Sequence, residues 1–212
     1  MAEQRYMYVV FSSTKCGIGS FIRLMTKNRY NHMSVTLDPT LSTLYSFARY
    51  HKSTPFYAGF VHESCLRYKG EGQANIKVAA IPLTDEQYTK AKDYLENMQG
   101  NKDIYIYNLL SAITNITRRK ININNAYTCV EFAVKTIDTV GVDSRISQLN
   151  FYTIKELENL LESKVVYEGK YPDWAENAQW GDDVFVSPIS FVKGSVNSLR
   201  TQARLFKRLI KS

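Results

Sequence analysis

The sequence TCVEFAVKTIDTVG, residues 128–141, decides which fold we expect for this chain. Its apolar residues recur at the three- and four-residue spacing that places them on one face of a helix. Thr128 can accept a hydrogen bond from an amide of the first turn, and Gly141 can adopt the left-handed conformation that ends many helices. We therefore expect a helix over 128–140 that buries one stripe, formed by Val130, Ala133, Val134 and Ile137.

Several segments before and after this helix have the composition of strands. Residues 31–37 alternate strictly, with apolar side chains at 33, 35 and 37, and turn residues at 38–42 predict a hairpin with a return strand at 43–48. Further strands are expected at 6–11, 56–61, 75–82 and 164–168, and helices at 18–27, 84–98, 106–116 and 152–162. The sequence therefore predicts an α+β fold with a central, mostly antiparallel sheet against which the 128–140 helix packs.

The composition is that of a folded globular chain. It has 212 residues, of which 44% are hydrophobic and 22% charged, and this excludes a disordered or collagen-like protein. No apolar run approaches the roughly 18 residues of a membrane span, and the N-terminus lacks the layout of a signal peptide. From these features we expect a soluble, cytoplasmic protein.

Positive charge is concentrated at the C-terminal end of the chain. The formal net charge is +7, but the last 22 residues hold six basic and no acidic side chains, so the preceding part is nearly neutral. We expect one domain over 1–190 and a basic amphipathic helix over 191–212, and we do not expect nucleic-acid binding by the body. The basic residues are Lys193, Arg200, Arg204, Lys207, Arg208 and Lys211.

This terminal helix also has an apolar stripe, for which two interpretations are open. The stripe can pack on the domain and leave the basic side chains in solvent, or it can bind an anionic membrane surface or an acidic partner. We favour packing. The stripe consists of Val196, Leu199, Ala203, Phe206 and Ile210, widened by Leu205 and Leu209.

Cys129 is the candidate nucleophile because it opens the 128–140 helix. Unpaired amides and the positive end of the helix dipole stabilise a thiolate there. Cys16, Cys65 and Cys129 form no CxxC pair, so we expect neither a disulfide framework nor a metal or other cofactor. Glu131 lies close to the thiol in sequence, and we expect its charge to oppose thiolate formation.

His32 is the candidate base, since it begins the alternating strand on its polar face with Ser34. If the hairpin pairs Ser34 with Ser46, then Ser46 shares this face and can orient the imidazole. His62 is a reserve base, and we expect His51 in a loop.

The order of strand histidine, polar residue on the next strand and helix-leading cysteine resembles the circularly permuted NlpC-type cysteine hydrolases. These papain-like proteins are related to the lecithin:retinol acyltransferase group. The resemblance covers about residues 6–140 and is carried by Tyr30–Val35, Leu44–Arg49 and Ala126–Phe132.

The resemblance implies a permuted papain-like fold and assigns a role to each candidate residue. Cys129 would be the nucleophile, His32 the base and Ser46 the third polar residue, while the Cys129 amide and Tyr127 would stabilise the oxyanion. Thr128 and Ser34 would line the substrate site.

The leading function is hydrolysis of an amide bond through an acyl-enzyme, in a peptide, a cell-wall-type peptide or a small amide conjugate. The alternatives are a lipid acyltransferase or thioesterase that uses the same two residues at a membrane, and a catalytically weak binding module of the same fold. A nucleic-acid binder that acts through the basic tail alone comes last.

Overall fold

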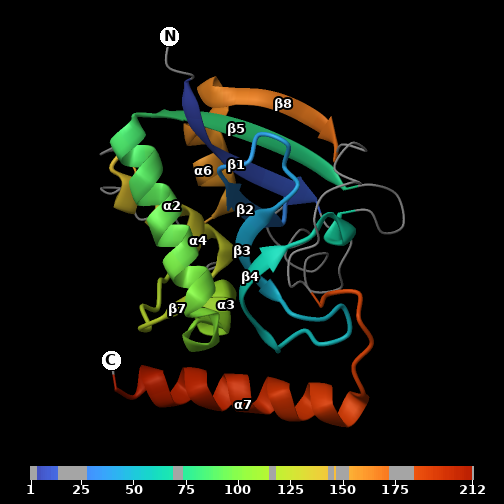
Figure 1. Ribbon diagram of the computed structural model, residues 1–212. Helices are drawn as coiled ribbons and strands as arrows, with labels where there is room; N and C mark the ends of the chain where they lie inside the picture. Colours follow the sequence, from blue (N-terminus) through green and yellow to red (C-terminus); the bar gives the residue numbers. More distant parts are fainter. Residues whose placement is uncertain are drawn as a thin grey trace.

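A computed structural model describes residues 4–13, 28–68, 74–114, 118–142, 146, 153–171 and 184–211 of the chain. Within these ranges the fold is α+β, with a mixed eight-stranded sheet and five α-helices (Figure 1). Cys16 and the expected helix at 18–27 lie outside the described residues.

The strands are β1 (Arg5–Ser13), β2 (His32–Thr36), β3 (Leu44–Arg49), β4 (Ala58–Glu63), β5 (Asn75–Leu83), β6 (Ile106–Tyr107), β7 (Ala126–Tyr127) and β8 (Val165–Lys170). The α-helices are α2 (Asp85–Gly100), α3 (Leu109–Thr114), α4 (Cys129–Val140), α6 (Ile154–Leu160) and α7 (Phe191–Leu209). Short 3₁₀ helices are η1 (Cys65–Arg67), η2 (Lys102–Ile104) and η4 (Glu162–Lys164).

The strand order in the sheet is β7-β6-β4-β3-β2-β1-β5-β8. Neighbouring strands are antiparallel except β6 and β7, which run parallel, so the predicted mostly antiparallel sheet is confirmed. Val35 pairs with Tyr45, and this is the register that we predicted for the β2–β3 hairpin. It places Ser34 and Ser46 on one face of the sheet, together with His32.

The expected helix at 106–116 is divided in the structure. Residues Ile106 and Tyr107 form β6, which pairs with Gly59 of β4 and with β7, and the helix α3 begins only at Leu109. Asn108 separates the two elements, because its side-chain oxygen accepts a hydrogen bond from the Ser111 amide at 3.1 Å. The long-range strand pairs therefore override the local helical preference at the start of this segment.

Helix α4 forms as predicted and packs with α2 on the sheet. Thr128 and Glu131 make a capping box at its start, and Gly141 ends it in the left-handed conformation, with φ of 71°. Its buried stripe includes Phe132 and Ile137, which join a core with side chains of β1 to β5 and α2. This packing fixes the first residue of α4 against the strands β2 and β3, which the helix contacts.

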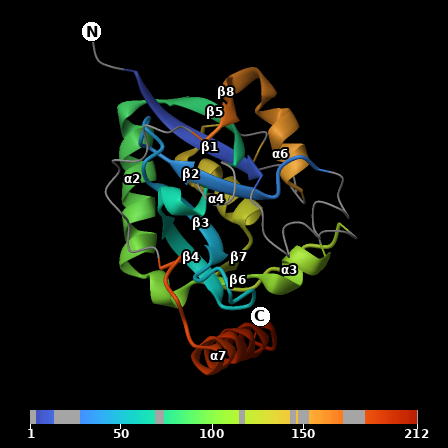
Figure 2. The same cartoon turned by 90° about the vertical axis from the view of Figure 1, so that its right-hand side faces the viewer.

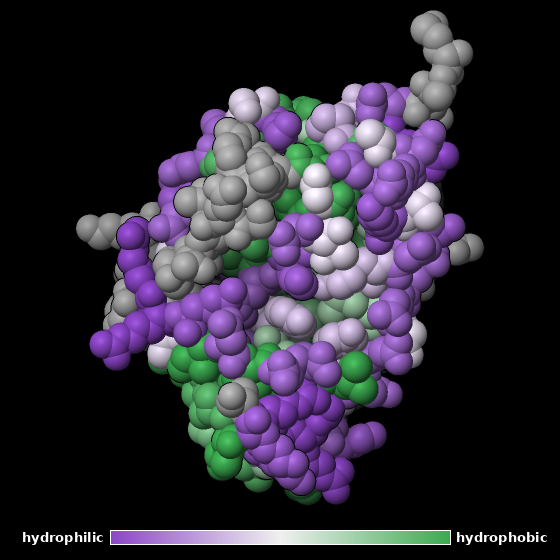
Figure 3. Space-filling view, turned by 90° about the vertical axis from the view of Figure 1, so that its left-hand side faces the viewer, coloured by the Kyte–Doolittle hydropathy of each residue, from purple (hydrophilic) through white to green (hydrophobic). Residues whose placement is uncertain are grey.

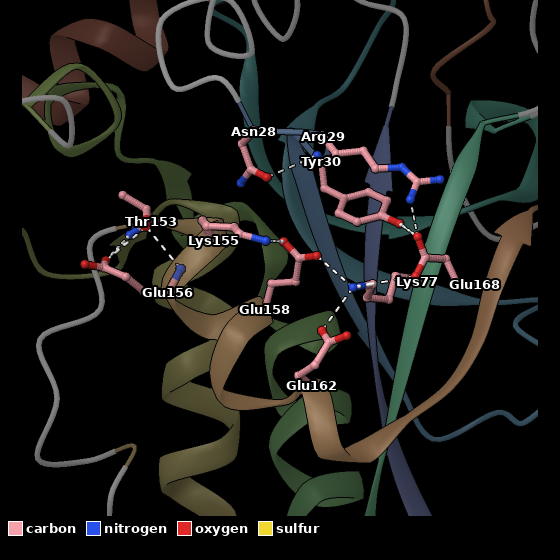
Figure 4. Close-up of polar contacts among 10 residues, drawn as sticks. All are labelled: Asn28, Arg29, Tyr30, Lys77, Thr153, Lys155, Glu156, Glu158, Glu162 and Glu168. Atoms are coloured by element: carbon pink, nitrogen blue, oxygen red, sulfur yellow. Dashed lines mark hydrogen bonds and ion pairs between the residues drawn. The ribbon is translucent and has the colours of Figure 1, made fainter.

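A cluster of charged residues connects the segment before β2 to other elements of the fold (Figure 4). The buried Lys77 of β5 pairs with Glu158 of α6 at 2.9 Å, and with Glu162 and Glu168 at 3.0 and 3.6 Å. The Tyr30 hydroxyl donates to Glu168 at 3.1 Å. These bonds join α6, η4 and β8 to the residues that immediately precede β2. Helix α7 lies at the opposite end of the molecule from β8, and Figure 2 shows it end-on.

Candidate functional site

The fold brings His32 and Cys129 together. His32 is the first residue of β2 and Cys129 the first residue of α4, and a hydrogen bond joins their side chains. Cys129 is 7% exposed and the His32 side chain 14% exposed, so both lie at the edge of the core rather than in its centre. The thiol thus lies beside a potential base and at the amino end of a helix.

Glu63, the last residue of β4, holds the other side of the imidazole. Its Oε1 lies 2.8 Å from His32 Nε2, and the residue is only 1% exposed. Because Nε2 is bound to the carboxylate, Nδ1 is the ring nitrogen that remains for the Cys129 thiol. The imidazole is therefore hydrogen-bonded to both the thiol and a carboxylate, and this carboxylate is a third group that the sequence analysis did not select.

A signal for Glu63 does exist in the sequence. The segment at 56–61 was expected to be extended, and two more residues would place Glu63 on the same face as Val61. A carboxylate at an inward position of a strand is unusual unless it has partners. Finding these partners requires the pairing of β3 with β4, in which Glu63 lies opposite Leu44, and no turn signal in the sequence fixes that register.

The buried carboxylate of Glu63 has a full set of hydrogen bonds. Ser46 donates to Oε1 at 2.7 Å, and Ser34 and Tyr68 donate to Oε2 at 2.7 and 2.5 Å. The guanidinium of Arg67 adds a positive charge 3.9 Å from Oε1. Such bonds replace the water that a buried charge loses and hold the carboxylate in one position.

The charges of the pair shift both pKa values. Burial alone would lower the pKa of His32, but the charge of Glu63 and the hydrogen bonds to Cys129 and Glu63 outweigh it and raise the pKa to about 10. Burial would raise the pKa of Glu63, but the charge and hydrogen bond of His32 lower it to about 2. Near neutral pH the site therefore holds an imidazolium between the carboxylate and the thiol.

Ser46 and Ser34 occupy the predicted face but contact Glu63. Ser46 donates to the carboxylate, so it acts on the imidazole through Glu63 instead of binding the ring as we expected. Ser34 is fully buried between Glu63 and Tyr68, 3.0 Å from the Tyr68 hydroxyl. The predicted substrate-lining position of Ser34 is therefore inside the protein, because Glu63 and Tyr68 cover this face of β2.

Thr128 and Tyr127, the other two predicted lining residues, directly precede the nucleophile. Thr128 is buried, and its hydroxyl accepts from the Glu131 amide at 3.2 Å, so this side chain caps the helix. Tyr127 is half-buried, with its ring edge-to-face on Phe47. The amides of Cys129 and Val130 lie in the first turn, where the helix itself supplies no acceptor.

The carboxylate of Glu131 has hydrogen-bond donors of its own, so it opposes a thiolate at Cys129 less than we expected. It accepts hydrogen bonds from the Thr128 amide at 2.7 Å and from the Ser111 hydroxyl at 2.5 Å. These donors compensate much of its charge, which reduces the repulsion that a thiolate at Cys129 would feel.

The other two histidines make contacts with residues other than Cys129. His51 is in a loop, where its Nδ1 lies 3.0 Å from the Ser187 carbonyl, as expected of a loop residue. His62 precedes Glu63 in β4, so it lies on the opposite face, and its ring stacks on Tyr45 at 4.7 Å. Cys65 begins η1.

Among the described ranges, no group of His, Cys, Asp and Glu side chains is arranged to hold a metal ion. No helix in that part of the chain has the length and apolar character needed to cross a bilayer. Comparisons with protein-family models, with curated proteins and with solved structures gave no match to this chain. The site is therefore interpreted from its own geometry. In an α+β fold, the side chains of Cys129, His32 and Glu63 lie together.

Proposed function

We propose that this chain is a cysteine hydrolase that cleaves an amide bond through an acyl-enzyme at Cys129. The observation that carries the proposal is the position of His32, which lies between the thiol at the start of α4 and the buried carboxylate of Glu63. A nucleophile, a base and a group that orients the base are the three parts that covalent acyl transfer needs.

The first half of the reaction forms the acyl-enzyme. The proton of the thiol resides on His32, and the Cys129 sulfur attacks the carbonyl carbon of the substrate. The amide of Cys129 donates to the oxyanion that forms, since it points out of the first turn of α4. His32 then gives its proton to the amine as the C–N bond breaks, and a thioester remains on Cys129.

The second half releases the acyl group. The imidazole, now neutral, takes a proton from a water molecule that attacks the thioester carbonyl. The carboxylic acid leaves as the C–S bond breaks, and the proton taken from water stays on His32, so the thiolate and the imidazolium of the starting state are restored. Glu63 remains ionised throughout, because it accepts hydrogen bonds from buried donors and stabilises the imidazolium.

An amide substrate suits this site because an amine leaves only after it is protonated. The raised pKa of His32 keeps the proton on the imidazole until the C–N bond breaks. We propose a peptide, a cell-wall-type peptide or a small amide conjugate as the substrate class. The order of His32 before Cys129, with a third residue on the intervening strands, supports assignment to the permuted papain-like, NlpC-type superfamily as part of the same proposal.

The rate of Cys129 alkylation as a function of pH tests this proposal without a known substrate. Iodoacetamide labelling followed by mass spectrometry would report Cys129 separately, with Cys16 and Cys65 as internal references. A free thiol titrates at about pH 8.5. We expect Cys129 to be labelled fast even at mildly acidic pH, and to lose this reactivity in His32→Asn.

Cys129 labelling that follows the profile of an ordinary thiol in the folded wild type would contradict the dyad. Circular dichroism and thermal melting of His32→Asn would establish that the variant is folded. With candidate amides and acyl thioesters, hydroxylamine-sensitive acylation of Cys129 separates covalent catalysis from simple binding. Release of an amine or of a thiol then distinguishes the amide hydrolase from the lipid acyltransferase or thioesterase.

A further inference from the structure

Helix α7 contacts the rest of the protein through one side, where Leu205 packs with Ile106, Ile123 and Ala126. Gly194, Thr201 and Leu205 are buried in this contact. Arg204 donates to the Asp103 carbonyl at 2.6 Å, and Arg208 donates to the Ile104 carbonyl at 2.7 Å. These two arginine side chains therefore attach α7 to backbone carbonyls of η2.

The greater part of the apolar stripe of α7 points away from the body. Leu199 is 71% exposed, Phe206 51% and Ile210 86%, and Val192 and Val196 also lie on the surface. Leu205 of the widened stripe is fully buried and Leu209 packs beside it, so the packing that we favoured holds for these two residues but not for the exposed remainder of the stripe. The reason is that the body offers an apolar patch to Leu205 and backbone carbonyls to Arg204 and Arg208, on the side of the helix away from the exposed residues.

The other basic residues of α7 lie beside the exposed stripe. At 100° per residue, their positions follow the stripe directly around the helix, and all of them are exposed; they are Lys193, Arg200, Lys207 and Lys211. No acidic residue occurs from 191 onward. Figure 3 views the molecule from the side where α7 ends, and at its lower end hydrophobic surface adjoins strongly hydrophilic surface.

We propose that α7 docks this protein on an anionic lipid bilayer. The apolar stripe enters the interface between headgroups and acyl chains, while the adjacent basic side chains bind anionic headgroups. A second copy of the chain fits this face poorly, because both helices would bring only positive charge to the contact. A groove in an acidic protein also fits less well. Figure 1 shows α7 as a straight helix on the outside of the molecule, and such a helix can lie along a flat bilayer surface over its whole length.

Docking leaves the contact between α7 and the body intact. The side of the helix that carries Thr201 and Leu205 is opposite to the exposed part of the stripe, so both sides can be occupied at once. This inference does not depend on the proposed hydrolase activity, because none of its residues belongs to the Cys129 site.

Co-sedimentation of the full chain with vesicles tests this proposal. The vesicles would be phosphatidylcholine alone, or phosphatidylcholine with about 30% phosphatidylserine. We expect binding to the anionic vesicles, and at least about tenfold weaker binding of the double variant Leu199→Gln/Phe206→Gln, which loses buried apolar area. A second variant, Lys193→Gln/Arg200→Gln/Lys207→Gln, is expected to lose a similar factor and much of the salt dependence.

The control is Ile113→Gln/Val166→Gln, which removes exposed apolar side chains outside α7 and should bind like the wild type. The proposal is overturned if the wild type does not bind anionic vesicles, or if the Leu199→Gln/Phe206→Gln variant binds them as tightly as the wild type. If light scattering shows a dimer for the wild type and a monomer for the Leu199→Gln/Phe206→Gln variant, the stripe forms a contact with a second copy. This result would also overturn the proposal. All these substitutions are at exposed positions, and thermal melting verifies the fold of each variant.

Discussion

The carboxylate of Glu63 and the imidazole of His32 meet across a strand to which neither belongs. His32 lies on β2 and Glu63 on β4, with β3 between them, yet Nε2 and Oε1 are 2.8 Å apart. Ser46, on the intervening β3, donates to the same Oε1 at 2.7 Å. Three adjacent strands therefore determine the position of the imidazole that is hydrogen-bonded to Cys129.

Substitution of Glu63 by Gln should separate positioning from charge. The glutamine is nearly the same size, but it leaves the imidazolium without a counter-charge, so the pKa of His32 should fall. We expect Cys129 alkylation near neutral pH to slow by about 100-fold, and hydrolysis of a substrate to slow by a similar factor. The matched control is Glu162→Gln, at an exposed carboxylate away from Cys129. Equal alkylation rates in Glu63→Gln and wild type would exclude an orienting role for the carboxylate.

The same pair predicts how stability varies with pH. The pKa of His32 is raised from 6.5 to about 10, so its stabilisation is complete below 6.5 and disappears as the pH rises through about 10. The pKa of Glu63 is lowered from 4.5 to about 2, so its stabilisation is complete above 4.5 and disappears as the pH falls toward about 2. The pair therefore stabilises the fold most between pH 4.5 and 6.5.

Thermal melting across pH measures this dependence. The difference in Tm between wild type and Glu63→Gln should be largest in that window and should shrink as the pH approaches about 10. A difference in Tm that stays constant over this range would mean that His32 is not charged in the folded protein.

Lys77 should be essential for stability and dispensable for thiol reactivity. It is buried and faces Glu158, Glu162 and Glu168, so Lys77→Met leaves the buried Glu158 with less positive charge nearby (Figure 4). We expect a loss of about 3–5 kcal/mol in the free energy of unfolding, measured with denaturant. Lys92→Met, at an exposed lysine of α2, is the control and should change stability little. Loss of fast Cys129 labelling in still folded Lys77→Met protein would show that the cluster also positions His32.

We expect a substitution at Gly59 to lower the stability of the sheet edge and also to change the reactivity of Cys129. A Cβ at this position would lie 2.3 Å from the Tyr50 hydroxyl and 2.7 Å from the Tyr105 carbonyl, next to the pair that Gly59 makes with β6. Since β6 pairs with β7, which leads into Cys129, Gly59→Ala should cost about 1–3 kcal/mol and slow Cys129 alkylation. Gly100→Ala, where nothing lies within 4 Å, is the control. Unchanged stability and alkylation in Gly59→Ala would disprove this coupling.

Much of the fold follows from local signals. The cap of Thr128, the αL residue Gly141 and the stripe between them define α4 within a single segment, and the structure confirms its bounds. The β2–β3 register is likewise set by a short turn, so the pairing of Val35 with Tyr45 was predictable. From the sequence, the approach of His32 to Cys129 could be expected only from the order of these residues in the chain and from the family resemblance.

The rest was decided by contacts between distant residues. Glu63 reaches His32 only because β4 pairs with β3 across the connection at 50–57, which is too long for a short turn motif to fix the register. The amphipathic pattern of α7 defines a stripe but not the layer it faces; the burial of Leu205 and the carbonyls that Arg204 and Arg208 bind leave most of the stripe on the outside. The sequence by itself determined the elements and the helix-leading thiol, because capping and periodicity act within a few residues. Only the tertiary structure decided the third group of the site and the exposed face of α7, because strand pairing and burial act between segments far apart in the chain.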